Sequence, residues 1–228
     1  MYKIKRAIIL AAGQGTRLRP YTDSVPKSLL QIAGKPIIER TIEILLSKGI
    51  DDITIVTGYL HDKFEYLKSK YGVSLVINYA YDAGSNLISL QCAVSKIEDC
   101  VIIDGDLLLK PDAILNEVQG SGYAYVKRQR ASEWAIIFNN SNRIKTIVAD
   151  SSEKHDFNAL YSISYWVGKT ALKYQHAIFN ASDSVRYADD IAITMPDLYG
   201  YKVRASDLIE IDTVEDYEHV KRTMEKAR

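Results

Sequence analysis

Apolar residues along the chain form short continuous runs that alternate with stripes at helical spacing. Residues 6–10 form an apolar run followed by small residues and glycines, which predicts a strand buried on both faces. Pro36 precedes a stripe of isoleucines and leucines that ends before Gly49, and such flanking residues mark a helix. The same reasoning predicts further strands at 53–57, 75–77 and 101–103, and further helices at 60–71 and 87–94.

The order of these elements predicts an α/β fold. Strands that alternate with helices at this spacing form right-handed crossover units, so we expect a Rossmann-like, mostly parallel sheet. After residue 120 the pattern indicates strands with few helices between them, and we expect a small antiparallel extension that covers one side of the parallel sheet. Thr213 and Asp216 should cap a last helix. The strands expected in this second half lie at 122–126, 134–138, 144–149 and 160–166.

Composition narrows the class of protein. The chain has 228 residues, of which 29 are basic and 29 acidic; this balance predicts no nucleic-acid partner, because phosphate binding needs a clustered positive excess. No apolar stretch reaches the ~18 residues of a membrane span, and the run at residues 7–12 is too short for an export signal. We therefore expect no membrane insertion and a cytoplasmic location. Cys92 and Cys100 lack metal-binding spacing and are expected to be buried free thiols.

The segment after the first strand, residues 10–20, is rich in small residues and glycines. Ligands bind at the carboxyl ends of strands in open α/β sheets, and small residues let backbone amides approach phosphate oxygens, although a tight turn alone would also fit. The Walker pattern is absent. The dinucleotide fingerprint fails because it needs a glycine at Leu18 and an acidic residue after the second strand.

This segment and the next resemble the nucleotidyltransferases, enzymes that join a nucleoside triphosphate to a phosphorylated acceptor. The family signature G-x-G-T-R-x-x-P-x-T…P-K-[SA]-L is matched by Gly13, Gly15, Thr16, Arg17, Pro20, Thr22, Pro26, Lys27, Ser28 and Leu29. The resemblance implies nucleotidyltransferase topology and a loop that wraps the triphosphate. Its binding residues would be Leu10, Ala11, Ala12, Gly13, Gly15 and Thr16. Arg17 and Lys27 would act in catalysis by neutralising phosphate charge, unless they are merely a structural ion pair and a surface lysine.

Two aspartates flank a glycine at the end of the expected strand 101–103. Asp104 and Asp106 are good Mg²⁺ ligands, although a turn with solvated acids would also fit. In the family, an aspartate at this step binds the Mg²⁺ on the triphosphate, which implies Asp106 as a metal ligand and Asp104, behind it, as a further residue of the nucleotide site. Family members close the metal site with a late aspartate or asparagine. We place it at Asp189, although the pair Asp189-Asp190 would also suit a helix N-terminus.

Longer stretches are similar to the bacterial CTP:phosphocholine cytidylyltransferases. This similarity covers nearly the whole chain and includes residues 56–60, 64–68, 70–73, 75–78, 132–134, 164–166 and 210–217. It implies transfer of CMP from CTP to phosphocholine, giving CDP-choline and pyrophosphate. Residues 85–90 resemble the stretch Asn-Asn-x-x-Ser-Leu of these enzymes, with Ser85 in place of one asparagine. Asn86 and Ser89 are therefore expected near the base and sugar.

We expect a single domain, 1–228, with a nucleotide-binding half at 1–120 and an acceptor-binding half with the C-terminal helix at 121–228. Aromatic faces recognise a quaternary ammonium, so Trp134, Trp166 and Tyr187 are candidates, although strand aromatics are usually core residues. Ala188 stands where these enzymes carry tryptophan. This difference would admit a primary amine instead, in phosphoethanolamine or 2-aminoethylphosphonate, paired with Asp190 or Glu133.

Other roles stay open. Lys127, Arg128 and Arg130 could hold the acceptor phosphate or form a solvated charge run. A sugar-1-phosphate nucleotidyltransferase is the enzymatic rival, and it would need polar side chains where the tryptophans stand. A regulatory nucleotide-binding module is the non-enzymatic rival, and it would be expected to lose Lys27 or Asp106. An oligomer is compatible with the sequence.

Overall fold

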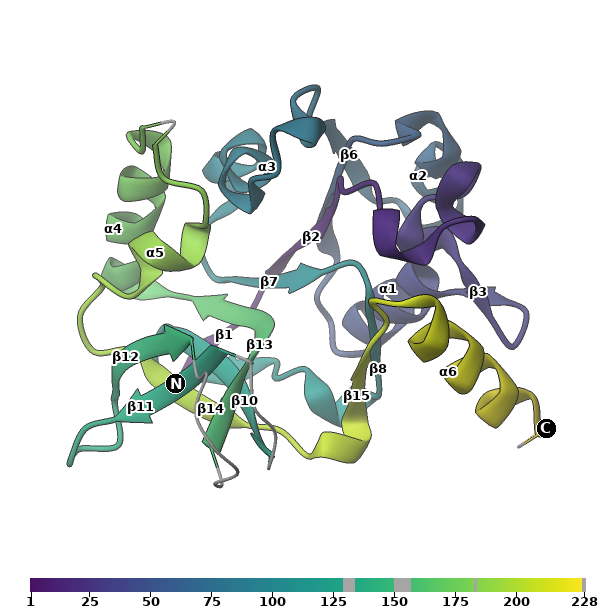
Figure 1. The fold of residues 1–228 in the computed structure, drawn as a ribbon. Coiled ribbons are helices and arrows are strands. Elements are labelled where there is room, and N and C mark those ends of the chain that lie inside the picture. The colour runs from purple at the N-terminus through teal and green to yellow at the C-terminus, as the bar shows by residue number, and fades with distance from the viewer. Residues whose placement is uncertain (129–133, 150–156, 183, 227–228) are drawn as a thin grey trace.

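The computed structural model describes residues 1–128, 134–149, 157–182 and 184–226 (Figure 1). Its central sheet has four parallel strands in the order β7-β2-β5-β6, which confirms the predicted α/β fold. The expected strand boundaries hold to within one residue at most ends. These strands are β2 (Arg6–Ala11), β5 (Asp52–Thr57), β6 (Ser74–Ile77) and β7 (Cys100–Asp104).

The helices of the first half are α1 (Ile37–Ser47), α2 (Tyr66–Tyr71) and α3 (Asn86–Cys92). Pro36 precedes α1 and Gly49 follows it with φ 73°, as the sequence predicts. The helix expected over 60–71 is divided, because Leu60 takes a left-handed conformation and a 3₁₀ turn precedes α2. Gly72, with φ 72°, ends α2.

The second half departs more from expectation. Its longest strand, β13 (Phe157–Trp166), runs antiparallel beside β7, so the extension continues the edge of the sheet and does not cover its face. The helix α4 (Gly168–Phe179) was not expected, whereas α5 (Ala188–Ala192) carries Asp189 and Asp190 in its first turn, as the alternative interpretation of this pair predicts. Both helices pack with α3 at one end of the molecule (Figure 1). The other strands are β10 (Gly122–Arg128), β11 (Trp134–Phe138), β12 (Ile144–Ala149) and β14 (Tyr199–Lys202).

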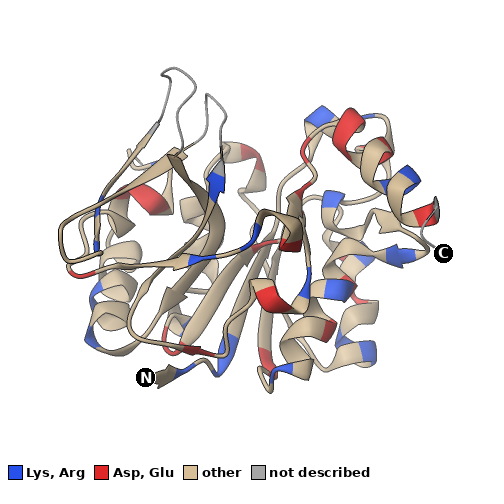
Figure 2. Cartoon of the chain, turned by 90° about the horizontal axis from the view of Figure 1, so that it is seen from below, with Lys and Arg blue, Asp and Glu red and all other residues tan. Residues whose placement is uncertain are grey.

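Charges of both signs are spread over the whole ribbon (Figure 2).

Both cysteines are free; Cys100 is buried as expected, but Cys92 is exposed. Cys92 is the last residue of α3, and the expectation of two buried thiols was wrong for it. None of the described helices has the length and apolar character needed to cross a membrane.

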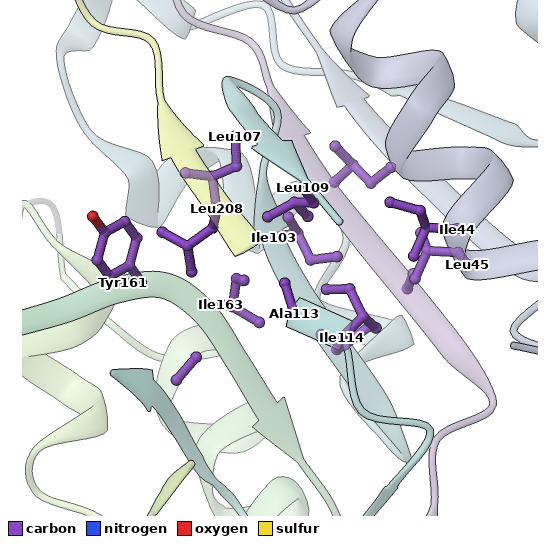
Figure 3. Packing of buried hydrophobic residues seen from close by; sticks show 14 of the residues in the cluster. Ile44, Leu45, Ile103, Leu107, Leu109, Ala113, Ile114, Tyr161, Ile163 and Leu208 are labelled. Carbon is purple, nitrogen blue, oxygen red and sulfur yellow. The ribbon is translucent and has the colours of Figure 1, made fainter. Parts of the chain in front are cut away.

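Two short strands hold the C-terminal segment against the sheet. β8 (Leu107–Leu109) pairs antiparallel with β15 (Leu208–Glu210). Leu107, Leu109 and Leu208 are buried beside Ile103 of the sheet and Ile44 of α1 (Figure 3). This packing fixes the position of the residues that directly precede β8 and follow β15.

The C-terminal helix α6 (Val214–Lys226) begins as predicted. Thr213 and Asp216 cap it reciprocally, with N···O distances of 2.9 Å from Thr213 N and 3.2 Å from Asp216 N. Its Tyr217 donates a hydrogen bond to the carbonyl of Gln31. The remaining short strands are β1 (Tyr2–Lys3), β3 (Gln31–Ile32), β4 (Lys35–Pro36) and β9 (Glu117–Val118).

Candidate active site

A cavity of about 330 Å³ opens at the carboxyl edge of β2 and β7. It brings together every residue expected to bind nucleotide, both expected cations and one expected metal ligand: Leu10, Ala11, Ala12, Gly13, Gly15, Thr16, Arg17, Lys27, Asn86, Ser89, Asp104 and Asp106. The sequence did not predict the other residues of the lining, which are Ser28, Tyr81, Gly84, Ser85, Gly105 and Asp212.

The glycine-rich loop is folded against the segment that carries Lys27. Gly15 has φ 62°, and a Cβ there would lie 3.0 Å from Cβ of Lys27 and 3.2 Å from Cγ2 of Thr22. The carbonyl of Gly15 accepts a hydrogen bond of 2.8 Å from the hydroxyl of Thr22. Only glycine suits this position, because both its backbone conformation and the close approach exclude a side chain.

A second glycine joins the ends of β2 and β7. Gly105 donates a backbone hydrogen bond of 2.8 Å to Leu10, and a Cβ on Gly105 would lie 3.1 Å from that same carbonyl. The two strand ends therefore touch. This contact places Asp104 and Asp106 beside the glycine-rich loop.

Three carboxylates converge next to this loop. Oxygens of Asp106, Glu210 and Asp212 lie within 4.8 Å of one another. Pairing of β8 with β15 aligns Leu107 with Glu210, and the backbone N–H of Ile211 donates to the carbonyl of Asp106. One oxygen of Asp106, Oδ1, is buried without a hydrogen-bond partner. Carboxylate oxygens in this arrangement suit a hard divalent cation.

Asp189 is not in this group, so its expected position as the partner of Asp106 is not what the structure shows. Its carboxylate instead accepts a hydrogen bond of 2.7 Å from the hydroxyl of Tyr123. The sequence did offer a signal for the alternative. Glu210 ends a strand of three residues, and Asp212 stands directly before the helix cap at Thr213.

The two expected cations contact the same carboxylates. Nζ of Lys27 lies 2.6 Å from Oδ2 of Asp106 and 2.6 Å from Oδ1 of Asp212, and Arg17 approaches the latter oxygen at 3.1 Å. Burial tends to lower the pKa of Lys27, but Asp106 and Asp212 outweigh it and leave that pKa raised. The Lys27 ammonium is therefore firmly charged.

A smaller cavity of about 50 Å³ lies behind Asp104. Burial raises the pKa of Asp104, and the nearby Asp106 raises it further; burial also raises the pKa of Asp189. Within the described part of the chain, neither carboxylate forms an ion pair with lysine or arginine. Hydroxyls complete the polar lining, and they come from Tyr123, Ser162, Ser164 and Tyr174. Such a cavity favours a small cation.

Asn86 connects the two cavities, because it lines both. Its Oδ1 accepts a hydrogen bond of 2.9 Å from the backbone N–H of Ala188, and its side chain also hydrogen-bonds to Asp189. Ser85 donates to the carbonyl of Arg186 at 2.6 Å. The start of α3 is therefore tied to the start of α5.

The two tryptophans occupy different environments. Trp134 is 48% exposed on β11, whereas Trp166 has no exposed surface. The Trp166 ring stacks on Tyr174 with centroids 3.5 Å apart, and its N–H donates to Ser164. The prediction that Trp166 contacts the acceptor is wrong, because the ring lies in the core behind the small cavity.

The remaining acceptor candidates are less well placed. Tyr187 is 45% exposed and Asp190 is also exposed, but neither these residues nor Trp134 is among those that line the two cavities. Lys127 is exposed on β10. Glu133 and Arg130 lie outside the described residues.

Comparison with known proteins agrees with this geometry. The model of the MobA-like NTP transferase domain matches residues 7–162, which is more than half of the chain. The chain belongs to this family. A choline-phosphate cytidylyltransferase of Streptococcus pneumoniae is 37% identical over 93% of this chain and 95% of its own. A 2-aminoethylphosphonate cytidylyltransferase of Lancefieldella rimae is 30% identical over 91% of this chain and 88% of its own.

Solved structures extend the comparison to three dimensions. That of a CTP:phosphocholine cytidylyltransferase from Streptococcus pneumoniae superposes with a TM-score of 0.88 and 36% identity, and covers 96% of this chain and 98% of that one. Nucleotidyltransferases of this family generally use a divalent metal. Asp106, Glu210 and Asp212 fit such an ion, because they offer clustered oxygens and one of these is a buried oxygen without a partner.

Proposed function

We propose that this protein transfers CMP from CTP to phosphocholine, giving CDP-choline and pyrophosphate. The observation that carries the proposal is the cavity lined by the glycine-rich loop, two cations, Asp106 and Asp212, with Glu210 beside these two acids. Relatives named choline-phosphate cytidylyltransferase, at 37% and 35% identity over more than nine-tenths of the chain, support the choice of substrates.

The proposed reaction is a direct displacement. An oxygen of the acceptor phosphate attacks the α-phosphorus of CTP, the bond from that phosphorus to the bridging oxygen of the β-phosphate breaks, and pyrophosphate leaves with the electron pair. No cysteine or histidine is among the described residues that line the larger cavity, which supports a reaction without a protein nucleophile.

Positioning and charge would account for the catalysis. Backbone amides of the loop at 13–17 would bind the phosphates, while Arg17 and Lys27 would offset negative charge that builds up on the leaving group. Asp106, Glu210 and Asp212 would hold Mg²⁺, which supplies charge stabilisation to the triphosphate when bound.

The halves of the chain would divide the substrates, with one exception. We propose a single domain in which residues 1–120 bind nucleotide and residues 121–228 bind the acceptor, since one sheet includes strands of both halves. The exception is the segment at 210–212, because Glu210 and Asp212 belong to the second half and would hold the metal on the triphosphate. A cytoplasmic location is part of the proposal, as free thiols suit a reducing compartment.

The exposed ring of Trp134 provides a first test of the acceptor. If this ring covers the trimethylammonium group, Trp134→Ala should raise the KM for phosphocholine by ~10-fold and leave the KM for CTP unchanged. Trp134→Phe should recover most of the loss, because it keeps an aromatic face. Steady-state kinetics with both substrates would check this, and an equal rise in both KM values would contradict it.

A primary-amine acceptor is the second candidate. The small cavity favours it, because Asp104, Asp189 and the surrounding hydroxyls can accept N–H hydrogen bonds that a trimethylammonium group cannot donate. The relative from Lancefieldella rimae, named for 2-aminoethylphosphonate, also supports it.

Asp189→Asn distinguishes the two candidates. With a primary amine, loss of the charge should lower kcat/KM by ~10-fold or more, a larger effect than that of Trp134→Ala. With phosphocholine the order should be reversed. The measurement is kcat/KM for phosphocholine, phosphoethanolamine and 2-aminoethylphosphonate in the wild type and both variants; equal losses for all three acceptors would count against both assignments.

The overall proposal is tested by pyrophosphate release. The four nucleoside triphosphates should be crossed with phosphocholine, the two primary amines and glucose 1-phosphate. We expect the highest rate with CTP and phosphocholine. Release only with a sugar phosphate would overturn the proposal in favour of a sugar-nucleotide enzyme, and no release with any pair would favour a regulatory module.

A further inference from the structure

The ammonium of Lys27 lies between the carboxylates that suit a divalent metal. It is 2.6 Å from Oδ2 of Asp106 and 2.6 Å from Oδ1 of Asp212, and the Lys27 side chain is only 15% exposed. The same two carboxylates belong, with Glu210, to the group whose oxygens lie within 4.8 Å of one another. One cation of the chain therefore already bridges two of the three acids.

A divalent ion would need this same space. Mg²⁺ binds carboxylate oxygens at about 2.0–2.1 Å, so an ion shared by Asp106 and Asp212 would lie where Nζ of Lys27 now lies. The ammonium and the ion also repel each other strongly at such short range. Both cannot contact these two oxygens in the present arrangement.

The glycine-rich loop offers Lys27 another set of partners. Cβ and Cδ of Lys27 would lie 3.0 Å and 3.5 Å from a Cβ on Gly15, so the stem of the side chain runs along this loop. Arg17, Gly13 and Gly15 line the same cavity. A triphosphate bound at the loop would therefore present its oxygens close to the path of the Lys27 side chain.

We propose that Lys27 competes with the divalent ion for Asp106 and Asp212, and that the triphosphate resolves the competition by drawing Lys27 to itself. The metal then enters together with the nucleotide, and the protein alone binds it weakly. This inference rests on the proposed function only in that a triphosphate is the ligand. It does not depend on the acceptor.

The test is a titration of the nucleotide-free protein with Mn²⁺. The electron paramagnetic resonance signal of the free ion measures how much Mn²⁺ stays unbound. Lys27→Met keeps the length of the stem and removes the charge, so it should tighten Mn²⁺ binding by about 10-fold or more. Lys63→Met is the matched control, because Lys63 is exposed outside both cavities and its replacement should change nothing. Adding Asp212→Asn to Lys27→Met should abolish the gain.

Different results of this assay contradict the inference about Lys27 and the proposed function. The inference is overturned if the wild type and Lys27→Met bind Mn²⁺ with equal affinity, whether that affinity is high or low. Lys27→Gln is the second variant, and circular dichroism would establish that each is folded. The binding assay needs neither CTP nor acceptor, so it is independent of the proposed function. If Lys27→Met gains Mn²⁺ affinity but the wild type releases no pyrophosphate, only the proposed function is contradicted.

Discussion

Asp106→Ala should lower kcat/KM for nucleotidyl transfer by ~10³-fold or more, since charge stabilisation at such sites contributes several kcal/mol to the transition state. Asp212→Ala should have an effect of similar size, because the two carboxylates share Lys27 and the same candidate metal position. The measurement is steady-state pyrophosphate release at saturating Mg²⁺.

Asp51→Ala is a suitable control, because Asp51 is exposed at the start of β5, away from both cavities. Its activity should match that of the wild type. Activity within tenfold of wild type in Asp106→Ala would show that this carboxylate does not hold the metal. A large loss in Asp189→Ala with a small loss in Asp212→Ala would restore the pairing first expected from the sequence.

Trp166→Ala should lower the free energy of unfolding by about 3–5 kcal/mol. The ring is fully buried, stacks on Tyr174 and donates a hydrogen bond to Ser164, so its removal leaves a cavity and an altered polar contact. Urea denaturation would measure the effect.

Trp134→Ala is the control for Trp166→Ala in the measurement of unfolding free energy. Trp134→Ala should change the free energy of unfolding much less, by about 1 kcal/mol or below, because half of its side chain is already exposed to solvent. Equal destabilisation by both substitutions would contradict the core assignment of Trp166.

The family signature, carried by a short stretch of sequence, was sufficient to select residues that lie together in one cavity on the nucleotide side. The strand–loop unit at residues 6–17 and the step from Asp104 to Asp106 are contiguous, and the residue types required there follow from local backbone geometry. Gly15 and Gly105 show why, since close contacts exclude a side chain at each. The residues expected to bind nucleotide line one cavity, although Gly105 was not among them, and their roles stay a prediction.

The sequence pattern did not predict which strands far apart in the chain pair with each other. Asp212 reaches the cavity because β15 pairs with β8, about a hundred residues earlier in the chain, and strands of three residues are too short to reveal their partner. The helix α4 was missed although its buried residues Ala171, Tyr174 and Ile178 recur at helical spacing, because no side chain caps its start. Trp166 was misassigned because composition alone cannot tell a ring in the core from one at a ligand.

The pairing of β8 with β15 also has a consequence during synthesis. A chain emerging from the ribosome completes the phosphate loop and Asp106 long before Glu210 and Asp212 are translated. Until the C-terminal segment docks, the nascent protein has one of the three acids and no neighbour at Asp212 for Lys27. If these acids hold the metal, as proposed above, catalytic competence arrives only after the two distant segments have paired.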